Sequence, residues 1–324
     1  MTITRRGVLG AGLASAALPT AQLARAQGEW PDRPVRIVVP YAPGGGTDVT
    51  TRAIAEILSR KLGQNFVVEN RAGANGVVGT EAVGRSAPDG YTFVAATSTH
   101  VMNRQVVRRL PFNPISDFAP IALLARYPLV LMAGANGQFK SVADVVGAAK
   151  ARPGQIAQGT SDAQSSFTAN AFAKRADLQM VEVPYRGSGA YLADLTGGHL
   201  PVAWGSTATA MPLLASGTVR VLAVSSAERS RFLPDVPTLR ESGIQGADFV
   251  GWFGLFGPAK LSEAIAAKLN AAINAAYGEP SLKQRLESLA VDPAPLGIPA
   301  FAALLREEDA RWEAAARDNL LPRE

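Results

Sequence analysis

One unit recurs five times along this chain: an apolar, β-branched run, then a loop rich in glycine, serine and threonine, then a helical pattern. Strands that alternate with helices predict a parallel sheet covered by helices. Ligands of such sheets bind at the carboxyl ends of the strands, and all five loops should lie there. The recurrence therefore predicts an α/β fold with a ligand site built from distant segments. The loops begin at Tyr41, Thr97, Thr160, Tyr185 and Gly205.

The first unit, from Val35 to Leu62, shows the pattern most clearly. Its β-branched start is typical of a buried strand, and Pro40 ends the strand because proline cannot donate to a ladder. From Thr47 the apolar residues recur with a helical period. The three glycines in between either make a tight turn or direct N–H groups of the helix at an anion. The loop lacks both the dinucleotide-binding glycine spacing and the P-loop lysine, so it suits a small anion better than a polyphosphate.

Residues 1–26 have the features of a cleaved export signal. Arg5 and Arg6 give a positive start, residues 8–18 are uncharged and mostly apolar, and residues 24–26 form an A-x-A cleavage site. The run around the two arginines also resembles a twin-arginine signal, so the Tat and Sec routes both stay open. We expect a mature, periplasmic protein that begins near Gln27.

Charge argues against a nucleic-acid partner. The chain carries 32 basic and 27 acidic residues, and the predicted signal removes three arginines and no acid, which leaves 29 against 27. This balance is ordinary for a soluble protein. No later segment is an uninterrupted apolar run of membrane length. The chain also has no cysteine, which excludes disulfides and thiolate ligands.

The residues favour binding over catalysis. His100 and His199 are the only histidines and lie far apart, so we expect no metal site. No serine lies in a G-x-S-x-G elbow. Asp48 falls in a first helical turn, where an acid commonly complements the helix dipole. His100, at the start of a predicted helix, stays open as a ligand contact.

Hydroxyls and helix N-termini alone can hold a carboxylate. A hydrogen bond to a charged group contributes about 1.5–3 kcal/mol, and a helix N-terminus adds roughly 0.3–1 kcal/mol. Four or five such bonds, less the cost of association, reach micromolar affinity, about −8 kcal/mol. A carboxylate site built from these loops therefore needs no arginine.

Six motifs, in this order, resemble those of the Bug family, the extracytoplasmic solute receptors of tripartite tricarboxylate transport systems. The resemblance covers essentially the whole mature chain and is specific for the family but not for the ligand. The motifs are VPYAPGGGTDV, SAPDGYTF, LPFNPISDFAPI, VPYRGSGAYLADLTGG, RSRFLPDVPTLRESG and WFGLFGPA.

The resemblance implies a type 2 periplasmic-binding-protein fold of class α/β, with two lobes and a hinge of two crossover strands. The crossovers would lie near 121–125 and 219–225. Lobe one would comprise 27–124 plus 224–324, and lobe two 125–223. The implied function is a monomeric receptor, without cofactor or metal, that captures a small carboxylate for a membrane permease. A ligand sensor that contacts a histidine kinase is an alternative, and an α/β hydrolytic enzyme is a weaker one.

The resemblance also assigns ligand-binding residues, all of them in the predicted loops. They are Tyr41, Ala42, Pro43, Gly44 and Gly45 in the first loop, Thr97, Ser98 and Thr99 in the second, Thr160, Ser161, Ser165 and Ser166 in the carboxylate-capturing third, and Gly187 and Ser188 in the fourth. Gly205 stands where the family often has an acid, which argues against a ligand with an ammonium group. Arg186 stands where many members have lysine, and it either pairs with a second carboxylate or is solvated.

Overall fold

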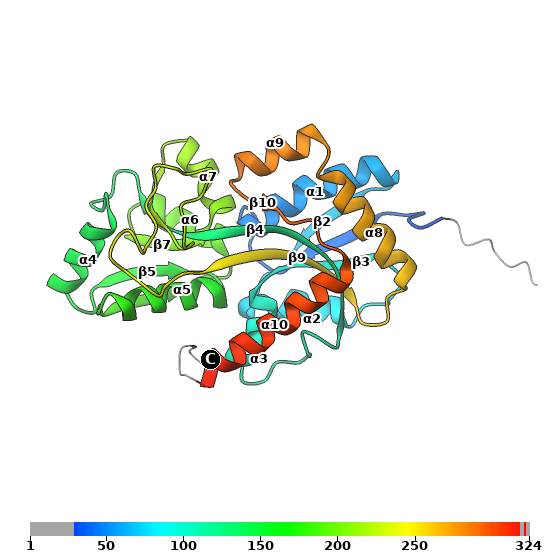
Figure 1. Ribbon diagram of the computed structural model, residues 1–324, viewed down its shortest axis with the longest axis horizontal. Coiled ribbons are helices and arrows are strands. Elements are labelled where there is room, and N and C mark those ends of the chain that lie inside the picture. The colour runs from blue at the N-terminus through cyan, green and yellow to red at the C-terminus, as the bar shows by residue number, and fades with distance from the viewer. Residues whose placement is uncertain (1–28, 318–320, 322–324) are drawn as a thin grey trace, which may run out of the picture.

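The computed structural model describes residues 29–317 and 321 of the chain. The predicted export signal at 1–26 lies outside the described residues. Figure 1 shows two lobes side by side, one built from the middle of the chain and the other from segments on both sides of it. The long strands β4 (Phe118–Gly134) and β9 (Val250–Pro258) connect them. The prediction of an α/β fold with two lobes and two crossover strands is confirmed. The crossover expected near 121–125 lies in β4, but the placement of the other near 219–225 is wrong. That segment is β8 (Val219–Val224), which pairs with β4 inside lobe two, and the second crossover strand is β9.

Lobe one is organised around strands in the order β2-β1-β3-β9-β4. β1 pairs parallel with β2 and β3, whereas β9 pairs antiparallel with both β3 and β4. The sheet is therefore mixed and not wholly parallel, because β9 returns between β3 and β4 in the opposite direction to β3. The other strand bounds are β1 (Val35–Val39), β2 (Phe66–Asn70), β3 (Thr92–Thr97) and the short β10 (Asp292–Pro293) beside β4.

Lobe two continues the sheet in the order β4-β7-β5-β6, with β8 also paired to β4. β5 pairs parallel with β6 and β7, while β4 runs antiparallel to β7 and β8. The parallel strands of both lobes thus end toward the junction between the lobes. The bounds are β5 (Ile156–Thr160), β6 (Met180–Pro184), β7 (Val202–Ser206) and β8 (Val219–Val224).

Helices cover the sheets, and several begin where the sequence places a capping residue. Ser141 accepts a hydrogen bond from Asp144 N–H and completes a capping box, as its spacing predicts. In lobe one α1 packs against α8 and α9, and α10 packs against α3 (Figure 1). The bounds are α1 (Gly46–Leu62), η1 (Ala74–Gly76), α2 (Val77–Gly84), α3 (Thr99–Val106), α4 (Val142–Ala151), α5 (Ala163–Arg175), α6 (Ser188–Thr196), α7 (Thr207–Ala215), α8 (Glu263–Ala276), α9 (Pro280–Ser288) and α10 (Ile298–Arg317).

The core of lobe two shows how β4 serves both faces of its sheet. Leu131 and Ala133 pack into the cluster with Trp204, while Val130 and Met132 pack into the opposite cluster. This alternation follows from the two-residue period of a strand. Because both faces are covered, the strand is apolar throughout this half. Lobe one has its own larger apolar cluster around β1, β3 and β9.

The hinge lies where β4 changes partner. Up to Pro128 it pairs with β9, and from Leu129 it pairs with β7 and β8. Buried Ser225 joins the two crossing segments, because its Oγ accepts from Leu129 N–H at 2.9 Å and donates to Phe249 O at 2.6 Å. The predicted crossover near 121–125 is thus part of one continuous strand that runs from Phe118 to Gly134. The predicted lobe boundaries at 124/125 and 223/224 stay a proposal.

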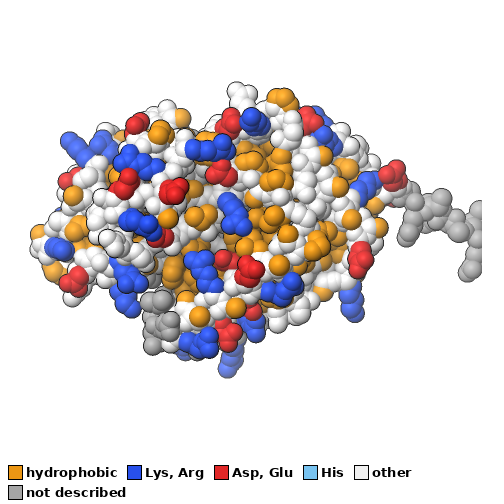
Figure 2. Space-filling model, viewed as in Figure 1, with side chains coloured by type: hydrophobic (Ala, Val, Ile, Leu, Met, Phe, Trp, Pro, Cys, Tyr) orange, Lys and Arg blue, Asp and Glu red, His pale blue; other side chains and the backbone are white. Residues whose placement is uncertain are grey.

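Figure 2 shows basic and acidic side chains mixed over the viewed face of the molecule. Most ion pairs among the described residues join side chains that are partly exposed, such as Arg33 with Asp89. Exposed ion pairs contribute little to stability. Within residues 29–317, no helix is both long enough and apolar enough to cross a bilayer.

Candidate functional site

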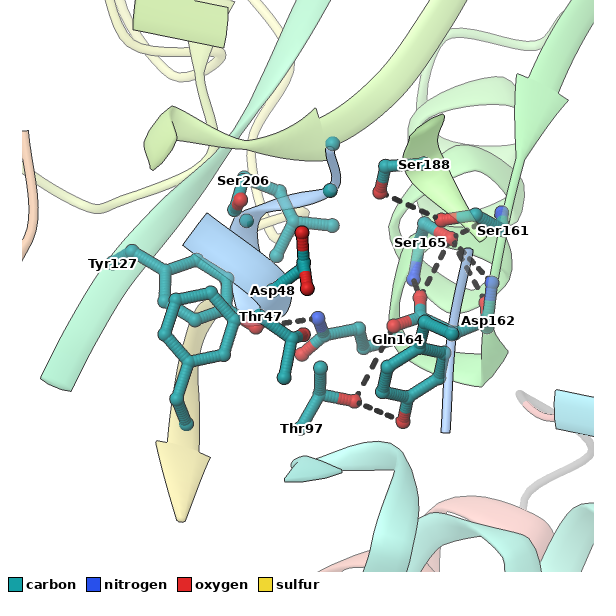
Figure 3. A pocket seen from close by; sticks show the side chains of 16 residues that line it. Thr47, Asp48, Thr97, Tyr127, Ser161, Asp162, Gln164, Ser165, Ser188 and Ser206 are labelled. Atoms are coloured by element: carbon teal, nitrogen blue, oxygen red, sulfur yellow. Dashed lines mark hydrogen bonds between the residues drawn. The ribbon is translucent and has the colours of Figure 1, made fainter. Parts of the chain in front are cut away.

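A small cavity lies where the two lobes meet, and all five predicted loops reach it. Four helices begin at its wall: α1 from lobe one, and α5, α6 and α7 from lobe two. Figure 3 shows the side chains of Ser161, Asp162, Ser165 and Ser188 grouped on the lobe-two side. The lining residues are Tyr41, Gly45, Gly46, Thr47, Asp48, Thr97, Tyr127, Leu129, Ser161, Asp162, Gln164, Ser165, Ser188, Gly205, Ser206 and Phe253.

Asp48 holds the glycine loop in place. Its Oδ2 accepts from Gly44 N–H at 3.0 Å, and its Oδ1 accepts from Arg52 Nε and Asn70 Nδ2, each at 3.0 Å. The carboxylate is buried, yet Arg52 compensates its charge. These contacts fit a structural acid in the first turn of α1, as the sequence indicates.

The glycine loop of lobe one touches lobe two directly. Gly46 N–H donates to Thr209 Oγ1 at 2.9 Å, and Ala42 N–H donates to Arg186 O at 3.2 Å. Gly189 approaches so closely that a Cβ there would lie 2.0 Å from Pro43 O. The loop therefore forms part of the contact between the lobes as well as part of the cavity wall.

Asp162 caps α5 and faces lobe one. Its Oδ1 accepts from the N–H and the Oγ of Ser165, at 3.0 and 2.7 Å. Its Oδ2 accepts from Thr97 Oγ1 at 3.3 Å, and Tyr41 OH lies 3.0 Å from the same Thr97 hydroxyl. This chain of bonds links the N-terminus of a lobe-two helix to the end of a lobe-one strand.

Gln164 makes a second bridge between the lobes. Its Oε1 accepts from Ser98 Oγ at 2.5 Å, and its Nε2 donates to Tyr127 OH at 2.6 Å. Its N–H also donates to Thr99 Oγ1 at 3.3 Å. All these groups are buried, so the bridge is a satisfied polar network of the kind that fixes one geometry.

Burial has the largest effect on the pKa values of Asp162, Tyr41 and Tyr127 in the cavity wall. It raises the pKa of the Asp162 carboxyl above its ordinary value, because the surrounding donors are neutral and the desolvation of the charge is larger. Burial, followed by the charge of Asp162, raises the pKa of both Tyr41 and Tyr127. The two phenols therefore stay protonated and act as hydrogen-bonding groups.

Replacing Asp162 by asparagine is expected to raise the free energy of unfolding at neutral pH. Since the folded-state pKa lies above the ordinary 3.8, wild-type stability present below that pH is lost as pH rises through the folded-state pKa. The difference in unfolding free energy between Asp162→Asn and the wild type should grow with pH. Its full size is about 1.4 kcal/mol for each unit between the unfolded-state and folded-state pKa of Asp162. Urea denaturation from about pH 4 to about pH 8 measures it, and a pH-independent gap would contradict this account.

Six of the fourteen predicted site residues line the cavity: Tyr41, Gly45, Thr97, Ser161, Ser165 and Ser188. The other eight lie close by but outside the lining: Ala42, Pro43, Gly44, Ser98, Thr99, Thr160, Ser166 and Gly187. Some of these have other partners, since Thr160 Oγ1 donates to Glu182 at 2.7 Å and Ser166 Oγ accepts from Asn170 at 3.3 Å. Ligand contact by any of the fourteen stays a prediction.

Sequence reasoning missed several lining residues, above all Asp162 and Gln164. The polar residues after Thr160 suggest a longer loop, whereas α5 already begins at Ala163. The Asp162-x-x-Ser165 spacing is a capping pattern and could have revealed the earlier start. Tyr127 and Phe253 belong to the crossover strands, so a search for glycine, serine and threonine loops does not find them.

His100 and Arg186, both left open by the sequence, lie away from the cavity lining. His100 is buried beside Phe118 and Phe256, and burial lowers the pKa of its imidazole to about 4. Its Nε2 pairs with Pro114 O at 2.9 Å. Arg186 is exposed. In the part of the chain that the structure describes, no three potential metal ligands lie together.

The cavity is small in this arrangement. Its volume of about 20 Å³ is room for little more than a water molecule. A four-carbon acid needs more space, so the lobes have to separate before such a molecule can enter. The contacts across the cleft are mostly single hydrogen bonds, which net about 1 kcal/mol each.

Two α/β lobes that close on a polar cleft, with helix N-termini turned into it, define a solute-binding receptor of the periplasmic-binding-protein class. The family model described as "Tripartite tricarboxylate transporter family receptor" (TctC) matches residues 50–319. This chain belongs to that family.

Relatives and solved structures are consistent with this family assignment. A Pseudomonas sp. (strain P51) protein, "UPF0065 protein in tcbD-tcbE intergenic region", is 32% identical over 96% of this chain and 93% of its own. The structure "R. palustris Rpa4515 with adipate" has a TM-score of 0.87 at 32% identity, covering 91% of this chain and 100% of that one. "MatC (Rpa3494) from Rhodopseudomonas palustris with bound malate" has a TM-score of 0.83 at 30% identity, covering 89% and 100%.

Proposed function

We propose that this protein is a periplasmic receptor that captures a small carboxylate between its lobes and delivers it to a membrane permease. The observation that carries the proposal is the convergence of four helix N-termini from both lobes on one cavity. Helix N-termini favour anions through their N–H groups and their dipoles. The two similar structures contain adipate and malate, which are both small carboxylates.

The polar groups of the cavity suit binding without turnover. They are mainly hydroxyls, tyrosines, an amide and backbone groups, and most side chains already have hydrogen-bond partners within the protein. Such groups orient a ligand and exclude water. Among residues 29–317 and 321, no lysine, arginine or histidine lines the cavity, so a carboxylate would be held by dipoles.

The permease is the partner that family membership supports. A kinase ectodomain remains the alternative partner, and it would require the same ligand site with a different docking surface. The predicted signal at 1–26 supports export. Co-purification of the exported protein with detergent-solubilised membrane proteins, with and without ligand, distinguishes a permease from a kinase.

A panel of mono- and dicarboxylates tests the function. We expect at least one acid to raise the melting temperature with micromolar affinity and to be recovered unchanged from the mixture. Native mass spectrometry of the protein as purified identifies any retained acid. Steady product formation that disappears in variants of the cavity residues would overturn the receptor assignment.

Ser165→Ala is expected to weaken carboxylate binding more than Ser166→Ala. Ser165 Oγ accepts from both Ser161 N–H and Asp162 N–H, at 2.9 and 3.1 Å, so its loss frees three groups at the cavity wall. Loss of such bonds costs about 1–3 kcal/mol, roughly a tenfold weakening of affinity or more. The Ser166 hydroxyl accepts from Asn170 and lies outside the cavity lining, so Ser166→Ala provides the matched control. Calorimetric titration of both variants measures the difference, and equal affinities would remove Ser165 from the site.

A further inference from the structure

The charges that line the cavity are all negative. Asp48 and Asp162 contribute carboxylates, and among the described residues no basic side chain lines the same space. A site for an anion would ordinarily present the opposite sign. The two acids therefore need separate explanations.

Asp48 is neutralised within lobe one. Arg52 Nε lies 3.0 Å from its Oδ1, and Asn70 and Gly44 donate to it as well. Its three bonds come from its own helix, the preceding loop and a neighbouring strand. The charge of Asp48 is thus balanced whether or not the lobes are in contact.

Asp162 has no such compensation. Its recorded partners are Ser165 N–H, Ser165 Oγ and Thr97 Oγ1, which are all neutral. It is 7% exposed. Burial raises its pKa, as expected for an acid without a cation beside it. Asp162 is therefore the group whose charge a ligand would encounter.

The opening of the cleft affects one oxygen of Asp162 in particular. Oδ1 keeps both bonds to Ser165, since the two residues belong to the same helix start. Oδ2 depends on Thr97, which lies in lobe one. When the lobes separate, Oδ2 loses that donor and faces the space that a ligand enters.

We propose that Asp162 determines the charge of the ligand: the site takes a carboxylate whose other end presents a hydrogen-bond donor, such as an ammonium, amide or hydroxyl group, to Asp162 Oδ2. A second ligand carboxylate at that place would put two anions in one buried site, where both cannot stay ionised. The inference rests on the proposed function and narrows it to monoanionic or zwitterionic acids.

This inference revises the expectation that Gly205 leaves the site without an acidic counter-charge. A Cβ at Gly205 would lie 2.3 Å from Tyr191 OH, so this fold has no room for an acid there. Tyr191 OH donates to Trp204 O at 2.9 Å and is held in place. The acid without a basic partner stands instead at Asp162, the N-cap of α5.

Paired probes that differ in charge at one end test the proposal. Succinate is compared with succinamate, and butyrate with 4-aminobutyrate, by calorimetric titration of the wild type, Asp162→Asn and Asp144→Asn. Asparagine caps helices as well as aspartate does, so Asp162→Asn should fold. Asp144→Asn removes an exposed carboxylate from the first turn of α4 and is the matched control.

We expect the wild type and Asp144→Asn to bind the amide or amino member of a pair about tenfold more tightly or better. Asp162→Asn should lose most of this preference and gain affinity for succinate. Equal binding of both members by the wild type, with no change in Asp162→Asn, would overturn the inference and leave the receptor function intact. Failure of every carboxylate, the half-amide included, would instead count against the function itself.

Discussion

Gly189→Ala is expected to remove most ligand binding while leaving both lobes folded. A Cβ at this position would lie 2.0 Å from Pro43 O, a backbone atom of the other lobe that cannot rotate away. The lobes would then stay apart at this edge of the cavity, and overpacking of this kind costs about 1–3 kcal/mol. Affinity should fall about tenfold to a hundredfold. Residue 189 lies in the first turn of α6, where alanine is a better helix former than glycine.

Gly147→Ala in α4 is the matched control, because a Cβ there meets no atom within 4 Å. Small-angle scattering with and without ligand measures closure, and calorimetric titration measures affinity. The control should close and bind as the wild type does, whereas Gly189→Ala should remain extended. Normal closure of Gly189→Ala would show that the glycine loop and α6 do not meet in the bound form.

Phe253→Ala is expected to cause the largest loss of stability. The side chain is 1% exposed and belongs to the apolar cluster of lobe one at the cavity wall, and its ring stacks on Tyr127 with centroids 4.1 Å apart. Deleting a buried phenyl group typically costs about 3–5 kcal/mol, because the cavity that remains collapses only in part. Urea denaturation followed by circular dichroism measures the change.

Phe232→Ala supplies the comparison, since Phe232 is only partly buried and its ring lies under the Arg231 guanidinium. That substitution should cost less than about 1 kcal/mol. A similar, small loss in both variants would mean that the β9 aromatic residues do not support the lobe-one sheet as their packing indicates.

The repeated strand–loop–helix units made most of the fold predictable. Each β-branched run, such as 35–39 or 219–224, is a strand in the structure, and the capping box at Ser141 lies where its spacing indicates. β9 had no such signal, because glycines interrupt its apolar residues. The structure gives a reason for one of them, since a Cβ at Gly254 would lie 2.7 Å from the Phe301 ring. That close contact depends on α10, which local sequence does not reveal.

The candidate site was predictable as a set of loops and less so as a set of side chains. Tyr41, Thr97 and Ser188 line the cavity because Tyr41 lies just after β1, Thr97 ends β3, and Ser188 starts α6. Tyr127 and Phe253 come from the crossover strands β4 and β9. The position of these strands depends on how distant segments of the chain pack together, which local sequence does not reveal. Gln164 was missed because a polar loop and a capped helix start have the same composition.

The position of β9 has a consequence for how the polypeptide matures. β9 lies between β3 and β4 in the sheet of lobe one, although it follows all of lobe two along the chain. A chain that has emerged only as far as residue 249 leaves one edge of β3 and the lobe-one half of β4 unpaired. Such unpaired edges promote aggregation. Lobe two can complete its own strands earlier. We therefore expect newly made protein to need chaperone protection until synthesis passes Pro258, and truncation before that residue should yield insoluble material.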